Sequence, residues 1–223
     1  MQIAELLERW QTDEGKPYKG ALIDRSAYRA DPDNIGCMCA QGQALHLVGG
    51  WTPERLSWAC QSEADRATAK LLNISCSHAV LLRVVNDRAD GAPAVVLTDP
   101  GRVLGDQWSK LLDFWWYLDR MTQKQLDAVW AAHHEAAWYS KRDAALHFVG
   151  KAARKAAGCA AYDACWGAAL VNAARETTSA SLEIQGAAIL RRDGKPFFFL
   201  PPFGFASPDD IPARPADYGI TGR

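Results

Sequence analysis

The chain has 223 residues, of which 48% are hydrophobic and 23% are charged, and its formal net charge at pH 7 is -1. This length can bury a substantial core, and the composition is that of a folded globular protein, which excludes the disordered and fibrous classes. A nearly neutral chain is not drawn by its overall charge to nucleic acid or to an anionic membrane, so binding driven by bulk charge is excluded as well.

The N-terminus and the cysteines bear on the compartment. Residues 1–10 are acidic and amphipathic and lack the basic and apolar regions of a secretory signal. No run approaches the ~20 apolar residues that span a bilayer, so we expect a cytoplasmic protein with no membrane partner. The six cysteines are too few for a disulfide scaffold, and in a reducing compartment they are expected to stay as thiols or to bind metal.

The first part of the chain predicts a series of short helices. Helical spacing of apolar residues and suitable end signals place them at 2–11, 37–48 and 62–72, the last with Ser62 as its cap. Thr52 and Pro53 predict another helix start, where Thr52 caps the free N–H groups and Trp51 packs on Leu56.

The stretch from 75 to 98 is ambiguous. Its β-branched residues permit a hairpin across the turn near 88–91, but we favour a helix over 77–85. Asp99 and Pro100 then start one helix that ends near Arg120. Its apolar face is formed by Leu104, Trp108, Leu111, Trp115 and Leu118.

Residues 122–176 are rich in Ala and contain no Pro, which predicts two long helices broken near Gly150. Thr122 and Gln125 form a capping box at the start of the first helix. Asp193 and Gly194 stand between two apolar runs and predict a hairpin, and the Pro-rich C-terminus predicts an extended arm.

The expected fold class is therefore mainly α, an Ala-rich helical bundle with a small C-terminal β-hairpin and an extended Pro-rich arm. We expect two lobes integrated in one domain. Residues 1–121 form a lobe that contains the Cys and Trp residues, and residues 122–223 form the Ala-rich helix pair with the hairpin and the arm.

Residues 10–120 resemble a family of short proteins of unknown function from actinobacteria and their phages. That family carries an early G-A-L segment, then C-x-x-G-A-L, then W-N-D-x-P-G-R-T. The matching segments are K-G-A-L at 19–22, C-A-Q-G-Q-A-L at 39–45, V-N-D at 85–87 and P-G-R at 100–102. This chain departs from the pattern at Gln43, which separates the Gly from the Ala, at Val85, and by an insertion before 100. The resemblance implies an actinobacterial or phage origin, with the host cytoplasm as the location for a phage protein, and it implies no activity.

Two sets of residues have the chemistry of a site in this first half. Cys37, Cys39, Cys76 and His78 supply the three thiolates and one imidazole of a structural zinc site, although buried apolar packing explains the same residues. Cys76 and His78 with Asn86 and Asp87 offer a nucleophile, a base and an orienting group. The alternative for Asn86 and Asp87 is a role in turns and caps.

The second half offers weaker candidates. His134 lies on the first Ala-rich helix, where packing or solvation is the ordinary role of such a residue. The basic residues Lys151, Arg154, Lys155, Arg191 and Arg192 form a possible anion patch, yet no nucleic-acid motif accompanies them. The nucleotide-binding and hydrolase signatures G-x-x-x-x-G-K-[ST], G-x-G-x-x-G and G-x-S-x-G are absent from the sequence.

These observations predict a non-enzymatic accessory protein that binds a protein partner or a second copy of itself and needs no metal or cofactor. The expected contact surface is the aromatic arm, with Phe197, Phe198, Phe199, Phe203 and Phe205. The alternative is an enzyme or a small-ligand-binding protein with a pocket between the Cys/His lobe and the Ala-rich helices.

Overall fold

The computed structural model describes residues 2–12, 15–88, 93–104, 106–125, 128, 197, 200 and 203–220. The chain divides into two compact units, the first comprising Met1–Gly105 with Pro215–Arg223 and the second Asp106–Arg214. The regular secondary structure of the described residues is helical, which confirms the mainly-α class. Among these residues, β pairing is limited to one isolated bridge between Ile23 and Met38. Among the described residues, no helix combines the length and apolar content that crossing a membrane requires.

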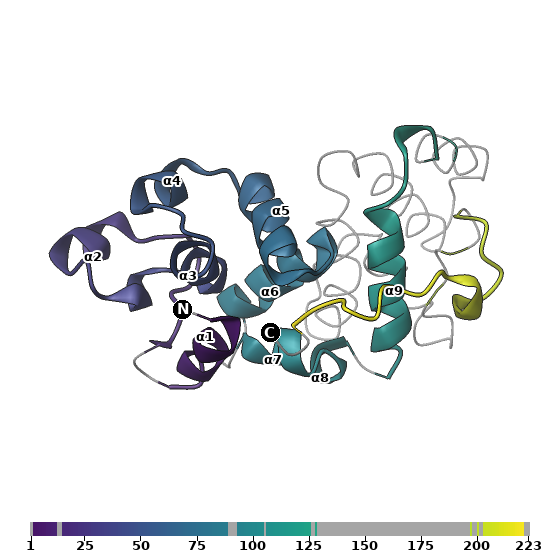
Figure 1. Cartoon of the computed structure of the whole chain (residues 1–223), viewed down its shortest axis with the longest axis horizontal. Helices are drawn as coiled ribbons and strands as arrows, with labels where there is room; N and C mark the ends of the chain where they lie inside the picture. The colour runs from purple at the N-terminus through teal and green to yellow at the C-terminus, as the bar shows by residue number, and fades with distance from the viewer. Residues whose placement is uncertain are drawn as a thin grey trace, which may run out of the picture. The chain divides into compact units, whose positions relative to one another are not determined.

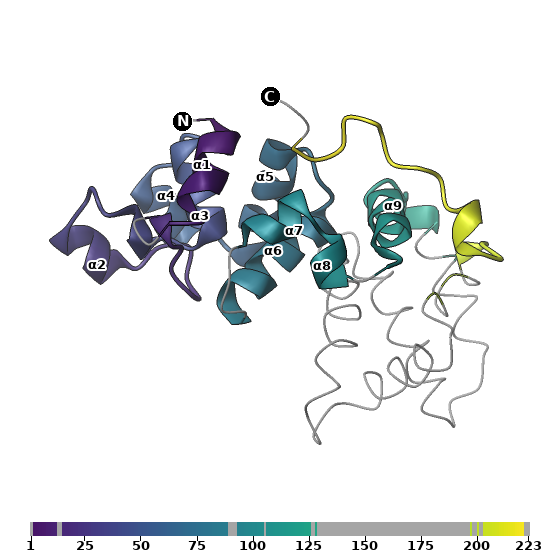
Figure 2. The same ribbon diagram turned by 90° about the horizontal axis from the view of Figure 1, so that it is seen from below.

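The first unit packs its helices around three central ones. Its elements are α1 (Ile3–Arg9), α2 (Arg25–Ala30), the 3-10 helix η2 (Ile35–Cys37), α3 (Ala40–Leu47), α4 (Pro53–Trp58), α5 (Gln61–Leu72), α6 (Cys76–Arg88), α7 (Ala94–Thr98) and α8 (Gly101–Leu104). Helices α3, α5 and α6 contact one another, and α5 and α6 lie side by side in both ribbon views (Figures 1 and 2).

The start of α4 follows the predicted chemistry. The Arg55 N–H donates to Thr52 Oγ1 at 3.2 Å, and Pro53 occupies the first turn. Trp51 and Leu56 are buried in the same apolar cluster. The predicted cap of α5 is wrong, because that helix begins one residue before Ser62, whose hydroxyl instead lies 3.3 Å from Cys60 Sγ.

The ambiguous stretch is helical on both sides of residues 89–92, which lie outside the described residues. Residues 76–88 form α6 and residues 94–98 form α7, so the helix prediction is confirmed and the hairpin alternative is wrong. The single helix expected after Asp99 is instead two, α8 and α9 (Trp108–Leu118), with Gln107 outside helical geometry. The apolar period continues across this break, which is why the sequence did not indicate it.

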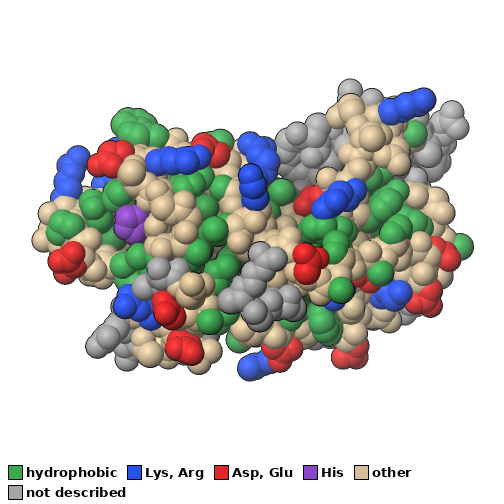
Figure 3. All heavy atoms as spheres, in the orientation of Figure 1, with side chains coloured by type: hydrophobic (Ala, Val, Ile, Leu, Met, Phe, Trp, Pro, Cys, Tyr) green, Lys and Arg blue, Asp and Glu red, His purple; other side chains and the backbone are tan. Residues whose placement is uncertain are grey.

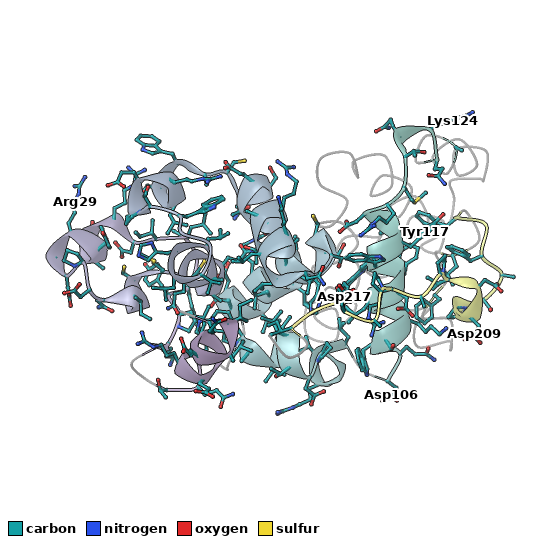
Figure 4. All side chains as sticks on the ribbon, in the orientation of Figure 1. Arg29, Asp106, Tyr117, Lys124, Asp209 and Asp217 are labelled. Atoms are coloured by element: carbon teal, nitrogen blue, oxygen red, sulfur yellow. The ribbon has the colours of Figure 1, made fainter. Side chains whose placement is uncertain are left out.

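The second unit, as far as it is described, consists of α9, the start of the next helix and the segment 203–214. Arg214 reaches back to α9, where its Nη1 donates to Ser109 O at 2.8 Å and its backbone N–H to Asp113 Oδ1 at 3.2 Å. The 3-10 helix η4 (Pro208–Asp210) lies in this segment, with Asp209 labelled in Figure 4. Thr122 and Gln125 form the predicted capping box, with Thr122 N–H to Gln125 Oε1 at 2.8 Å and Gln125 N–H to Thr122 Oγ1 at 3.3 Å. The rest of the Ala-rich stretch and the Asp193-Gly194 hairpin lie outside the described residues.

Residues 215–220 of the C-terminal segment belong to the first unit. Tyr218 is 8% exposed, and its hydroxyl lies 3.1 Å from Ser75 N and 3.0 Å from His78 Nδ1. Asn73 holds the same segment twice, because its Nδ2 donates to Asp217 O at 2.6 Å and its O accepts from Gly219 N–H at 2.7 Å. Local sequence patterns cannot reveal contacts between residues this far apart in the chain.

Candidate functional site

Three separate segments meet in the first unit, and the end of α6 holds them together. The Asn86 carboxamide accepts from Ala40 N–H at 3.3 Å, at the start of α3, and donates to Tyr18 O at 2.8 Å. Asp87 Oδ1 accepts from Gly20 N–H at 2.9 Å. Gly20, Ala40 and the pair Asn86 and Asp87 lie in three of the four segments on which the resemblance rests, at 19–22, 39–45 and 85–87. Asn86 and Asp87 therefore fix a loop and a helix start in this structure.

Two glycines allow the loop and α3 to meet. Gly20 has a φ of +102°, which L side chains rarely adopt, at the point where its N–H faces Asp87. A Cβ on Gly42 would lie 2.0 Å from Leu22 O, closer than any real Cβ contact. The backbone of the 20–23 loop thus rests directly on α3.

A pocket of about 210 Å³ opens beside this loop. Residues 20–23 and Arg25 form one wall, residues 56, 57, 59 and 61 form another, and Gln41 and Arg83 close it from α3 and α6. Small-molecule sites commonly measure about 300–1,000 Å³, so this pocket matches a compact group better than a large metabolite.

The wall behind the pocket is a buried polar network. Arg83 and Asp65 are each 7% exposed and form an ion pair, with Nε to Oδ1 and Nη2 to Oδ2 both at 3.2 Å. Gln41 is 0% exposed and donates from Nε2 to Asp65 Oδ1 at 2.9 Å and to Ala79 O at 3.0 Å. Its Oε1 has no hydrogen-bond donor within the described part of the chain. This network supplies a rigid acceptor and a neutralised cation next to the cavity.

The mouth of the pocket carries an exposed tryptophan. Ser57 and Ala59 line the pocket, and Trp58 between them is 80% exposed. Arg25, also a lining residue, stacks its guanidinium carbon 4.6 Å from the Trp58 ring centroid and donates from Nη2 to Ser57 O at 2.7 Å. In the space-filling view, hydrophobic and charged side chains stand next to each other above α4 (Figure 3). The Trp58 side chain is thus presented to solvent in a defined position.

The predicted zinc residues occupy different surroundings. Cys37 and Cys39 are buried, and burial raises the pKa of the Cys39 thiol to about 11. The Cys39 Sγ accepts a hydrogen bond from Gly42 N–H at 3.4 Å. His78 uses Nε2 toward Val96 O at 2.7 Å and Nδ1 toward the Tyr218 hydroxyl. Among the residues that the structure describes, no group of three or more His, Cys, Asp or Glu side chains is placed to hold a metal ion.

The predicted catalytic residues of α6 are separated by the helix itself. His78 and Asn86 are eight positions apart, which is roughly 12 Å along a helix axis. Cys76 and His78 lie in the first turn of α6, whereas Asn86 and Asp87 lie in its last turn. The structure therefore does not assemble these residues into one site, because they lie at opposite ends of α6.

The described part of the aromatic arm packs on α9. Phe203 is 8% exposed and meets Phe114 edge-on with ring centroids 5.0 Å apart, and Phe205 meets Tyr117, labelled in Figure 4, at 5.0 Å. Phe197 is half-buried. The prediction assumed an exposed arm, whereas the Phe203 side chain is buried because it packs on Phe114 of the same unit. Phe198, Phe199, His134, Lys151, Arg154, Lys155, Arg191 and Arg192 lie outside the described residues.

The sequence analysis missed the pocket residues, although signals for some of them exist. Arg83 interrupts the apolar run of α6, and a charged residue in a buried helix face implies a buried partner. Trp58 follows the inward-facing Leu56 by two positions, which turns it to the opposite side of α4. Nothing local indicates that Gln41 meets Asp65. Comparison of the chain with protein-family models, curated proteins and solved structures found no match.

Proposed function

We propose that this chain is a non-enzymatic binding protein that receives a protein partner on the surface formed by Arg25, Ser57, Trp58 and Ala59, here termed the Trp58 surface. The observation that carries the proposal is the 80% exposure of Trp58. Trp and Arg are the residues most enriched at the energetic centres of protein interfaces. Arg25 limits the freedom of the indole ring before a partner arrives, and this preorganisation lowers the entropic cost of binding.

The charges of this surface indicate the chemistry of the partner. Arg25 has no carboxylate within ion-pair distance in the part of the chain that the structure describes, whereas the neighbouring Arg55 is paired with Glu63 at 3.2 Å. Arg29 of α2 also points outward (Figure 4). A partner segment that places an apolar side chain on the indole and a carboxylate near Arg25 complements both features.

The test begins with capture of partners from a lysate of the source organism by the full chain and by Trp58→Ala. The captured protein is then purified and titrated directly by calorimetry. We expect Trp58→Ala to weaken binding at least tenfold, and Tyr18→Ala to leave it unchanged, because Tyr18 is an exposed aromatic that does not line the pocket.

Two results would overturn this proposal. One is a purified partner that binds wild type and Trp58→Ala with equal affinity. The other is self-association of the pure chain through Trp58 in sedimentation experiments, since this would make a second copy the occupant of the Trp58 surface.

A second candidate function is the binding of a small ligand, and the observation in its favour is the pocket of about 210 Å³ beside the loop at 20–23. We also propose that the second half of the chain folds as the sequence predicts, with an Ala-rich helix pair, a hairpin at Asp193 and Gly194 and an extended Pro-rich arm. The accessory role in a phage or an actinobacterium rests on the family resemblance of residues 10–120.

A further inference from the structure

We infer that the pocket beside Trp58 is a subsite for an acidic side chain, a Glu or an Asp of the protein partner. This inference rests on the proposed function, and it names the residue type that the partner places in the pocket. Its starting point is the charge of the pocket lining. Two of the lining residues are arginines, Arg25 and Arg83, and none of the described lining residues is an Asp or a Glu.

Arg25 has the donors that a carboxylate needs. One of its five guanidinium N–H groups donates to Ser57 O at 2.7 Å, and the other four have no acceptor among the described residues. The guanidinium carbon lies over the Trp58 ring, 4.6 Å from its centroid. A guanidinium in this position contacts the indole through its charge and still has N–H donors for a carboxylate.

The second lining arginine is already neutralised, and this selects for a single negative charge. Arg83 forms an ion pair with Asp65, which does not line the pocket, so the lining keeps one uncompensated positive charge, that of Arg25. An ammonium group would be repelled by this charge, and an apolar group would take it out of water without a partner. A carboxylate carries one negative charge at pH 7 and compensates Arg25, whereas the nearly two charges of a phosphate group exceed it.

The size of the pocket favours one side chain over a whole metabolite. Its volume of about 210 Å³ lies below the ~300–1,000 Å³ of common small-molecule sites. Trp58 is 80% exposed and stands between two lining residues, Ser57 and Ala59. One partner segment can therefore place a carboxylate in the pocket while a neighbouring apolar residue of the same segment covers the indole.

The test titrates the full chain with three probes that share one backbone. They are the N-acetyl N-methylamides of L-glutamate, L-glutamine and O-phospho-L-serine. In ¹H–¹⁵N NMR spectra we expect the glutamate probe to shift the amide signals of residues 20–23 and 57–61 and the Nε–H signal of Arg25. The glutamine probe should bind at least tenfold more weakly, because its hydrogen bonds to Arg25 lack the second charge. The phosphoserine probe should bind no more tightly than the glutamate probe.

Three results of these titrations would overturn the inference. They are equal binding of the glutamate and glutamine probes, tighter binding of the phosphoserine probe, and no shift at the pocket residues. Acetate that binds as tightly as the glutamate probe would overturn the assignment to a partner side chain and indicate a free small carboxylate.

Two substitutions that remove the same charge serve as test and control. Arg25→Gln should weaken binding of the glutamate probe at least tenfold. Arg66→Gln should leave this binding unchanged, because Arg66 is an exposed arginine of α5 that does not line the pocket. Equal affinity of the glutamate probe for Arg25→Gln and Arg66→Gln would contradict the role of Arg25.

A third variant separates this inference from the proposed function. Ala21 is exposed and lines the pocket but does not belong to the Trp58 surface, so Ala21→Trp adds a large side chain to the pocket lining and leaves that surface in place. The purified partner should bind Ala21→Trp at least tenfold more weakly than wild type. A partner whose affinity depends on Trp58 but is unchanged by Ala21→Trp would overturn the acidic subsite and leave the proposed function standing.

Discussion

The contact between the C-terminal segment and α6 gives the sharpest stability prediction. His78 Nε2 must donate to Val96 O at 2.7 Å, because a carbonyl only accepts, so in the neutral ring Nδ1 accepts from the Tyr218 hydroxyl at 3.0 Å. The same hydroxyl oxygen accepts from Ser75 N–H at 3.1 Å. Ser75 Oγ also lies 3.2 Å from this hydroxyl, but it keeps the hydrogen bond that it accepts from His78 N–H at 3.1 Å. Tyr218→Phe therefore removes the partner that Ser75 N–H and His78 Nδ1 share, and it leaves the aromatic packing in place.

The expected loss follows from the two groups that lose this partner. A buried donor or acceptor deprived of its hydrogen bond costs ~1–3 kcal/mol, so the loss of a partner by two groups should lower the free energy of opening of this region by about 2–6 kcal/mol. Hydrogen exchange measured by mass spectrometry on peptides covering 73–79 and 215–220 reports that local free energy. Protection should fall by roughly 30-fold or more.

Tyr28→Phe is the matched control for this measurement. Tyr28 is a half-buried tyrosine of the same unit, and its hydroxyl has no hydrogen-bond partner among the described residues. We expect it to change the exchange of these peptides by less than about 0.5 kcal/mol. If Tyr218→Phe had no larger effect than this control, the C-terminal segment would not be held by the Tyr218 hydroxyl.

Three further predictions follow from the same unit. Gly42→Ala should lower the free energy of unfolding by about 1–3 kcal/mol and lower the melting temperature, because its Cβ would lie 2.0 Å from Leu22 O. An unchanged melting temperature in calorimetry would contradict this close approach. Alkylation by iodoacetamide between pH 7 and 8, mapped by mass spectrometry, should modify Cys60 before Cys39. The hydrogen bond from the Ser62 hydroxyl lowers the pKa of the exposed Cys60 thiol and raises its thiolate fraction, whereas burial raises the pKa of Cys39 to about 11 and keeps it protonated. A chelator should leave the melting temperature unchanged, and stoichiometric zinc whose removal unfolds the protein would refute this.

The start of a helix was predictable where a capping residue acts on its close neighbours in the sequence. Thr52 with Pro53, and Thr122 with Gln125, form the expected caps because capping depends on neighbours within three or four residues. The break between α8 and α9 was not predictable, because the apolar spacing of the sequence continues through it.

The candidate site was less predictable than the fold because its contacts are long-range. Asn86 and Asp87 attracted a catalytic hypothesis on residue type, yet they hold a backbone segment more than sixty positions earlier in the chain. Gln41 attracted no hypothesis, because an isolated amide in a helix is common. Its role in the buried network depends on Asp65, which lies 24 positions later in the chain. Three of the four segments on which the resemblance rests, 19–22, 39–45 and 85–87, contact one another beside the pocket.

Helix α6 explains how the walls of the pocket are held in place. Three buried polar residues are spaced along this helix, and each contacts a different segment. His78 contacts Tyr218 of the C-terminal segment, Arg83 contacts the Asp65 carboxylate of α5, and Asn86 contacts the Tyr18 backbone and α3. Each of these groups would be costly to bury alone, so the segments that satisfy them are held in fixed positions. The pocket walls are therefore set by the folding of the unit.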